Sequence, residues 1–263
     1  SAASDVYKRQ MWSEPKMAYN GSIGSVVGLQ ASMLSDGTAL VAFTVDRDPA
    51  DDVSTDYEMA YRVIGADDAL GDLVVLTSDD ETDTNPQAAA VSANGTGHFV
   101  LAWYSTQDGG DIRLQAVGSD GQLYSGGSGY TVPASVKAVS QEDGLVISSD
   151  FRLAKRTPGS GIDGLTLVWA ETVPNGEGQA DHSVLYGAQL CQAGASLYLS
   201  TPQTLITLPD RTLANSFSAW RDGNGKVSAY IFGTYYDPTK TETVPVSDGN
   251  DSNGQPRPAP SGG

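Results

Sequence analysis

Carboxylates are the side chains of this sequence that are best placed to do chemistry. Nine of them fall in two short segments, 46–56 and 79–83: Asp46, Asp48, Asp51, Asp52, Asp56, Asp79, Asp80, Glu81 and Asp83. Ca²⁺ takes about six to eight oxygen ligands in proteins, and dense carboxylates also attract cationic partners. Neither segment has the spacing of a calcium loop with its glycine and terminal glutamate. Three interpretations stay open: a Ca²⁺ site, a surface for a cationic partner, or a solvated acidic surface.

Nucleophiles and metal-ligating groups are scarce. His98 and His182 have no second histidine or cysteine close by in the sequence, so each is expected to have a structural role. The single Cys191 excludes an intramolecular disulfide and a multi-cysteine zinc site. No Gly-x-Ser-x-Gly segment occurs, and no Ser/His/Asp constellation is supported. The sequence therefore predicts no catalytic residue and no required cofactor.

Glu171 is the carboxylate with the strongest case for acid catalysis. It follows Trp169 by two residues, so both side chains would share a face if both lay in one strand. A neighbouring indole raises the pKa of a carboxyl group, which would suit a general acid. However, Glu171 opens a long polar segment. We therefore expect it to be a solvated surface residue.

The overall composition narrows the range of partners. The chain has 263 residues, of which 39% are hydrophobic and 18% charged, so it can bury a sizeable core. Lys and Arg number 15 and Asp and Glu 32, so the net charge is 15 − 32 = −17. This charge repels phosphate backbones and anionic lipids, which disfavours nucleic acid and membrane surfaces as partners. No apolar run approaches the roughly 18 residues of a membrane span.

A repeated pattern organises the chain. Four segments each have a turn signal followed by a strand-like run that ends in an aromatic residue, at Phe43, Trp103, Trp169 and Tyr230. The intervals between these aromatics are 60, 66 and 61 residues. Such a near-constant period indicates a repeat architecture. Because these aromatics recur at one position of strands that look buried, we expect them to be core residues.

Each full unit contains about four strand-like runs. In the second unit they are expected at 87–91, 98–104, 111–117 and near 130–132, joined by Asn-Gly and Ser-Asp-Gly turns. The first runs are rich in small residues, as at 31–32, 88–90 and 218–219. Small side chains suit strands that crowd around a common axis.

These features resemble a β-propeller, and the chain looks like part of a secreted bacterial β-propeller repeat protein. The resemblance implies an all-β fold with about four four-stranded antiparallel blades, in a ring that need not be complete. Typical blades have about 40–50 residues, so longer loops are expected here. Sialidase-like propellers carry a Ser-x-Asp-x-Gly-x-Thr-Trp turn, which is missing. At the expected starts of the first strands stand Gln30, Gln87, Arg152 and Phe217, which offer only one arginine to clamp a substrate carboxylate.

The boundaries follow from the repeat. Residues 1–10 read as the in-frame translation of a sequencing adapter, and residues 11–27 form a lead-in. The propeller-like domain is expected over 28–245, with units at approximately 28–85, 86–148, 149–212 and 213–245. Residues 246–263 are rich in Gly, Ser, Asn and Pro and predict a flexible linker.

The long loops indicate where a partner would bind. In a four-stranded meander, the loops at 46–56, 105–110 and 171–182 and the link at 78–85 all open on one face, which is therefore acidic. We expect a non-catalytic binding or scaffolding module, extracellular or at the cell surface, with a carbohydrate or protein ligand at this face. One alternative is a fragment of a sialidase- or glycosidase-like enzyme that lacks its catalytic blades. Another is a passive spacer.

Overall fold

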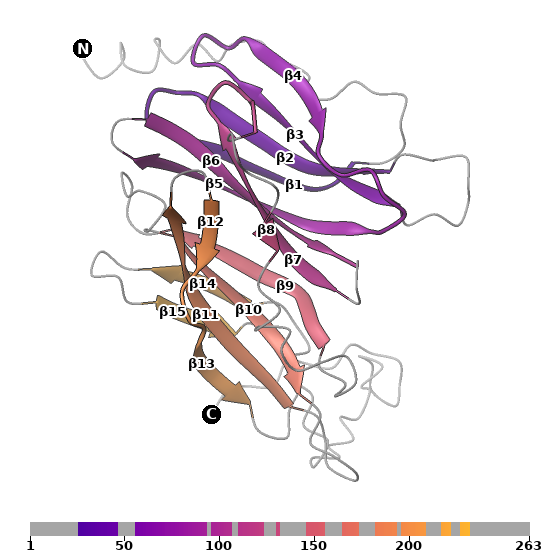
Figure 1. The fold of residues 1–263 in the computed structure, drawn as a ribbon, viewed down its shortest axis with the longest axis vertical. Coiled ribbons are helices and arrows are strands. Elements are labelled where there is room, and N and C mark those ends of the chain that lie inside the picture. The colour runs from indigo at the N-terminus through magenta and orange to yellow at the C-terminus, as the bar shows by residue number, and fades with distance from the viewer. Residues whose placement is uncertain are drawn as a thin grey trace, which may run out of the picture.

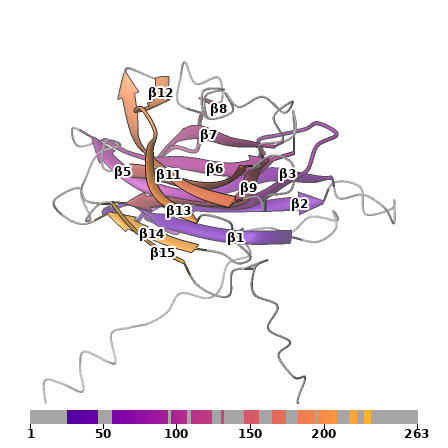
Figure 2. The ribbon, with the colours of Figure 1, turned by 90° about the horizontal axis from the view of Figure 1, so that it is seen from below.

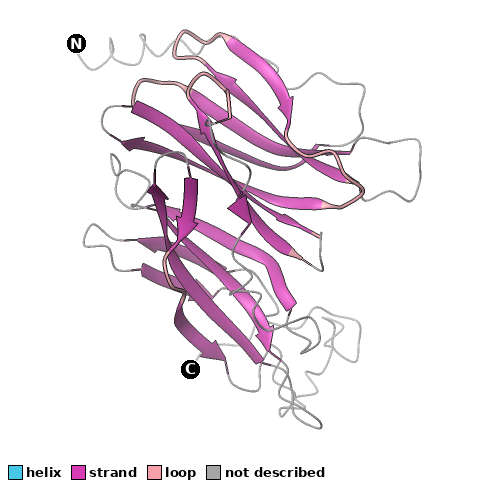
Figure 3. Cartoon of the chain, viewed as in Figure 1, coloured by secondary structure: helices cyan, strands magenta, loops and turns pink. Residues whose placement is uncertain are grey.

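The computed structural model describes residues 26–46, 56–93, 96–106, 110–123, 130–131, 146–155, 165–173, 182–193, 196–208, 217–221 and 227–231. Within these ranges the ordered elements are β-strands, and no helix is present (Figure 3). The described residues accordingly include no helix with the length and hydropathy of a membrane span. The adapter-like residues 1–10 and the predicted linker 246–263 lie outside the described residues.

The first sheet is an antiparallel meander of four strands in sequence order: β1 (Val26–Met33), β2 (Ala39–Asp46), β3 (Tyr57–Ile64) and β4 (Leu70–Val75). The turn between β1 and β2 is built by Asp36 and Gly37. The carboxylate of Asp36 accepts a hydrogen bond from the amide of Thr38, and Gly37 has φ 96°, which favours glycine. β1 begins two residues before the expected domain start at residue 28.

The second sheet confirms the strands predicted for the second unit. It contains β5 (Asp83–Ala93), β6 (Thr96–Ser105), β7 (Asp111–Gly118) and β8 (Tyr130–Thr131), again in sequence order. β6 is buried on both faces, as expected for a strand that lies between two neighbouring sheets.

The third sheet departs from the four-strand pattern. It contains β9 (Val146–Lys155), β10 (Leu165–Val173), β11 (His182–Ala193), β12 (Ser196–Leu199) and β13 (Gln203–Leu208). The long β11 pairs with β12 through residues 190–193 and with β13 through residues 183–187. β12 and β13 together therefore lie along the outer edge of this sheet, where the first and second sheets each have a single strand. A further antiparallel pair, β14 (Phe217–Arg221) and β15 (Val227–Ile231), forms the fourth sheet.

The four sheets are arranged as in a propeller, although the described sheets do not close into a ring. The first strand of each sheet lies beside the first strand of the next, so that β1, β5, β9 and β14 follow one another (Figures 1 and 2). Small residues in these strands allow this close approach. For example, the hydroxyl of Ser32 in β1 accepts a 2.7 Å hydrogen bond from the amide of Ala90 in β5. The fold is therefore an all-β, propeller-like array.

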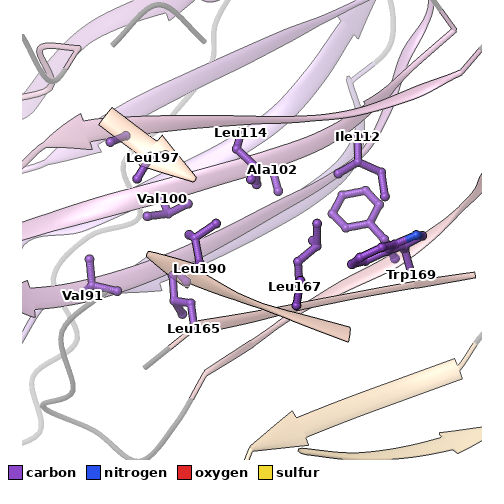
Figure 4. Packing of buried hydrophobic residues seen from close by; sticks show 14 residues of the cluster. Val91, Val100, Ala102, Ile112, Leu114, Leu165, Leu167, Trp169, Leu190 and Leu197 are labelled. Carbon is purple, nitrogen blue, oxygen red and sulfur yellow. The ribbon is translucent and has the colours of Figure 1, made fainter. Parts of the chain in front are cut away.

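Apolar side chains fill the spaces between successive sheets. One core lies between the first and second sheets and includes Leu40, Met59, Phe99 and Leu101. A second core lies between the second and third sheets, and its buried side chains are shown in Figure 4: Val91, Val100, Ala102, Ile112, Leu114, Leu165, Leu167, Trp169, Leu190 and Leu197. A smaller cluster joins the third sheet to Ala219 of β14. Each sheet is thus stabilised mainly by its neighbours.

A shared irregularity marks the first strands. The register of β1 shifts between Val27 and Gln30, and that of β5 between Thr84 and Gln87. Within each shift one residue has a positive φ, Gly28 at 63° and Asn85 at 51°. β1 and β5 continue past this bulge, which is why each begins four residues before the start expected from the sequence, at Gln30 and Gln87.

Tyr61 ties the first sheet to the second. Its hydroxyl donates a 2.9 Å hydrogen bond to the carbonyl of Gly121, and its ring is 1% exposed. Burial and the nearby charge of Asp120 raise the pKa of Tyr61 to about 12, so the phenol stays a donor at neutral pH.

We expect Tyr61→Phe to lower the free energy of unfolding by about 0.5–1.5 kcal/mol, because it removes this bond and leaves a carbonyl unsatisfied. Urea denaturation measures the change. Tyr198→Phe, at an exposed position of β12, is the matched control and should be neutral. Equal losses of stability in the two variants would contradict a stabilising role for the hydrogen bond between Tyr61 and Gly121.

Candidate functional site

The strand pairing brings the loop ends of the first two sheets together. Asp46 pairs with Tyr57 at the end of β2 and β3, and Asp83 pairs with Ser105, which pairs with Asp111 at the same end of the second sheet. The link 76–82 joins the two sheets at this end. We call the acidic residues described here the loop-end rim: Asp46, Asp56, Glu58, Asp79, Asp80, Glu81, Asp83 and Asp111.

Glu58 is a buried acid of this rim. It is 1% exposed, and its Oε1 accepts a 2.9 Å hydrogen bond from the amide of Asp79. Burial raises the pKa of the Glu58 carboxyl, and the charges of Asp79 and Asp56 raise it further, against the opposing effect of hydrogen bonds from Thr77 and Asp79. The link is therefore attached to β3 through a carboxyl group that is costly to ionise.

Asp83 is the second buried acid of the rim. It is fully buried, and its Oδ2 accepts hydrogen bonds from the hydroxyl of Thr77 at 2.5 Å and from the amide of Met59 at 3.4 Å. Burial raises the pKa of the Asp83 carboxyl, and the charge of Asp79 adds to this, whereas the Thr77 and Ser105 hydroxyls oppose it. Thr77 also accepts a 2.8 Å hydrogen bond from the amide of Met59. One hydroxyl thus joins β3 to the start of β5.

Thr106 holds the other end of the link. Its hydroxyl accepts a hydrogen bond from the amide of Thr82 at 2.9 Å and donates one to Oε2 of Glu81 at 2.7 Å. The amide of Thr106 donates to the carbonyl of Thr82 at 3.1 Å. The amide of Glu81 donates to the Asp79 carboxylate at 3.1 Å. These bonds fix the link, and Asp79, Asp80 and Glu81 stay exposed or half-buried beside it.

The predicted acidic residues divide into three groups. Asp56 and Asp79 interact electrostatically with Glu58, and Asp79 does so with Asp83 as well. Asp46, Asp80 and Glu81 lie on the same rim. Asp48, Asp51 and Asp52 lie outside the described residues.

Sequence reasoning missed Glu58 and Asp111, which are both buried. Glu58 lies inside β3, between Tyr57 and Met59, and outside the two acidic segments that the sequence singled out. Its burial depends on the link folding over it, which no local pattern reveals.

Calcium binding stays a prediction. Among the described residues, no three or more His, Cys, Asp or Glu side chains are grouped so that they could hold a metal ion. The rim carboxylates instead accept hydrogen bonds from backbone amides and threonine hydroxyls.

The expectation that Glu171 is solvated was wrong. β10 continues to Val173, so Glu171 pairs with Val184 and Ile147 inside the sheet, and it is 4% exposed. Its Oε1 accepts a 2.9 Å hydrogen bond from Nε1 of Trp169. Burial raises the pKa of the Glu171 carboxyl, although the indole hydrogen bond opposes this. The strand geometry that places the two side chains on one face thus produces a buried carboxyl at the seam of the second and third sheets.

Two aromatic side chains, Trp169 and Tyr186, interact with this carboxyl. The rings of Trp169 and Tyr186 stack with centroids 5.8 Å apart and planes at 25°. Burial and the charge of Glu171 raise the pKa of the half-buried Tyr186. Tyr104 packs partly buried against the same core.

The repeated aromatic positions are structural wherever their side chains are described. Phe43, Trp103 and Trp169 are at most 3% exposed. For Tyr230 only the strand position in β15 is described, and its backbone pairs with Ser218.

Comparison with known proteins gives only distant structural likenesses. No family model matches the chain, and no curated protein matches it. A solved structure to which it is similar is the Hadza microbial sialidase Hz136, with 12% sequence identity and a TM-score of 0.36. The alignment covers 81% of this chain and 46% of the sialidase chain, so the chain spans less than half of that protein's length. A likeness at this level assigns no activity.

Proposed function

We propose that this chain is a non-catalytic binding module whose loop-end rim captures a cationic segment of another protein, in an extracellular or cell-surface setting. The observation that carries the proposal is the fixed link. Asp79, Asp80 and Glu81 reach solvent from a backbone that Glu58 and Thr106 hold in place. Fixed carboxylates lose little conformational entropy when they pair with Lys or Arg. The net charge of −17 adds long-range attraction for a cation.

The charge of the rim can be tested separately from the charge of the whole molecule. Asp79→Asn, Asp80→Asn and Glu81→Gln together remove three charges from the rim while retaining oxygen acceptors for the Glu81 amide and the Thr106 hydroxyl. We expect this triple variant to bind a fluorescent oligolysine peptide about 10-fold more weakly at an ionic strength of about 0.15 M. Fluorescence anisotropy measures the affinity.

The matched control removes the same charge from the opposite end of the first sheet. Asp67, Asp68 and Asp72 are exposed around the turn between β3 and β4. At this ionic strength, substituting all three by Asn should leave the peptide affinity within about 2-fold of the unmodified chain. These charges lie at the other end of an eight-residue strand, about 26 Å away, whereas the screening length is about 8 Å. Equal losses in both triple variants would show non-specific attraction and contradict a rim site.

A fragment of a carbohydrate-active enzyme is the competing proposal, and Glu171 is the observation that favours it. A carboxyl group with a raised pKa is what a general acid needs. However, Glu171 and Trp169 are almost completely buried, so a substrate would have little access to them. Release of sugar from a sialylated or other glycan substrate, lost in Glu171→Gln, would decide for the enzyme.

A further inference from the structure

Two buried nitrogen atoms near the loop end of the second sheet have no hydrogen-bond partner in the described part of the chain: Nε1 of Trp103 on β6 and Nε of Arg113 on β7. Trp103 is 3% exposed, whereas Arg113 is half-buried. Most buried N–H groups in proteins are paired, because an unpaired one keeps its full desolvation cost. Two unpaired donors on neighbouring strands therefore indicate a place for an oxygen acceptor.

The strand pairing brings these two donors together. Trp103 and Arg113 are direct partners across β6 and β7, so their side chains share a face, with Cβ atoms about 4.5–5.5 Å apart. Ile112 and Leu114 point into the core with the third sheet (Figure 4), so Arg113 between them turns toward the first sheet. Trp103 belongs to the core between the first and second sheets. We call Nε1 of Trp103 and Nε of Arg113 the donor pair.

The donor pair lies next to the loop-end rim. Asp111 of the rim is two residues before Arg113 on β7, so both lie on one face of the sheet. Ser105, the strand partner of Asp111, lies on the same face, two residues after Trp103. Leu76, the first residue of the link, packs against the core that contains Trp103. A ligand held by the carboxylates of the link is therefore adjacent to the donor pair, which reaches solvent on the half-buried Arg113 side.

The surroundings favour a neutral acceptor over an anion. Asp83 and Asp111 are buried at the same end of this sheet, where Ser105 pairs with both, so an added negative charge there is costly. The net charge of −17 also repels free anions. An amide carbonyl is neutral and has two lone pairs, one for each donor. A peptide supplies such a carbonyl at every residue.

We propose that the donor pair binds a main-chain carbonyl of the cationic segment whose Lys or Arg side chains pair with Asp79, Asp80 and Glu81. This inference rests on the proposed function and adds to it how the rim tells a peptide from other cations. Exposed carboxylates alone attract any polycation. The donor pair adds hydrogen bonds only for a ligand with acceptor oxygens, so it selects a basic peptide over a polyamine.

Two probes of equal charge separate the donor pair from the charges of the rim. N-acetyl-tetralysine amide and spermine carry the same positive charge, but only the peptide has carbonyl groups and neither has a carboxylate. Trp103→Phe keeps an aromatic ring and removes one donor. We expect it to weaken binding of the peptide about 3–10-fold and to leave the affinity for spermine within about 2-fold. Isothermal titration calorimetry with the full chain measures both affinities, and circular dichroism checks that each variant is folded.

Arg113→Met is a second variant, at a half-buried position where substitution disturbs the core less. It removes a positive charge, which on its own would strengthen binding of both cationic probes. We expect weaker binding of the peptide and equal or stronger binding of spermine, an opposite response that charge alone does not produce. Arg62→Met is the matched control, because Nε of Arg62 already donates to the carbonyl of Gly71. It should leave both affinities within about 2-fold.

NMR of the indole N–H groups gives a readout at the donor itself. The chain has four tryptophans, and the signal lost in Trp103→Phe identifies Nε1–H of Trp103. The peptide should move this signal to lower field, whereas the signal of Trp169, whose indole already donates to Glu171, should stay in place. Equal losses for both probes, or a Trp103 signal that bound peptide does not move, would overturn this inference without contradicting binding at the rim. Failure of both probes to bind the unmodified chain would overturn the proposed function itself.

Discussion

Trp169→Ala is expected to lower the free energy of unfolding by about 3–5 kcal/mol, the range for truncating a large aromatic residue in a core. Trp169 is fully buried between the second and third sheets, where it stacks on Tyr186. Its removal creates a cavity and also takes away the indole N–H that bonds to Glu171. A buried carboxyl that loses its donor adds its own desolvation cost.

Thermal and urea denaturation, followed by circular dichroism, measure this loss. Tyr198→Ala is a suitable control because Tyr198 is an exposed aromatic residue of the same sheet, and it should change stability by less than about 0.5 kcal/mol. Trp169→Phe should fall between the two, since it keeps a ring but not the hydrogen bond. A loss below about 1 kcal/mol for Trp169→Ala would mean that the second and third sheets do not share a packed core.

Acidification from neutral pH is expected to stabilise the protein. Burial raises the pKa values of Glu58, Asp83 and Glu171 in the folded chain. Between the ordinary carboxyl pKa and the raised one, the folded state binds more protons than the unfolded state, so stability falls as pH rises. The contribution is thus present below the ordinary carboxyl range and is lost as pH rises through the folded pKa values. A tenfold change in one proton-binding constant is worth about 1.4 kcal/mol.

Differential scanning fluorimetry between pH 4 and pH 7.5 measures this as a rise in Tm on acidification, of about 2–4 °C for each kcal/mol. Glu58→Gln, Asp83→Asn and Glu171→Gln together should flatten the profile and raise Tm at neutral pH. The control variant, in which Asp67, Asp68 and Asp72 are replaced by Asn, removes three charges from exposed positions. It should keep most of the change in Tm with pH. A profile unchanged by the buried triple would contradict the pKa directions.

The repeat rhythm predicted the fold because it is a local property. The turn residues and the strand-like runs of the second unit recur at regular spacing, so β5 to β8 could be placed from sequence. The bulges at Gly28 and Asn85 could not, since the residues around them look like ordinary breaks between strands. The sequence also did not predict that two short strands, β12 and β13, pair with β11. This pairing is possible because β11 is long enough to pair with both.

The candidate site was predicted in outline only. Asp79, Asp80 and Glu81 mark the link and are exposed or half-buried, as their polar character predicts, whereas Asp83 beside them is fully buried. The buried acids Glu58 and Glu171 depend on contacts between distant segments or on where a strand ends. For Glu171 the sequence contained the relevant signal, its spacing from Trp169, but the polar residues after it suggested a loop. In the structure, β10 continues through Glu171, Thr172 and Val173, and the indole of Trp169 donates a hydrogen bond to Glu171, so this carboxyl is buried.

The most direct test of the binding account is to map where a cationic ligand lies. Two-dimensional amide NMR of the labelled chain, titrated with an oligolysine peptide, reports each backbone position separately. We predict saturable shifts at Asp79, Glu81, Thr82 and Thr106, whose amides take part in the fixed link, and little change around Asp67–Asp72. Shifts spread evenly over all acidic surfaces, or absent from the link, would contradict a binding site at the loop-end rim.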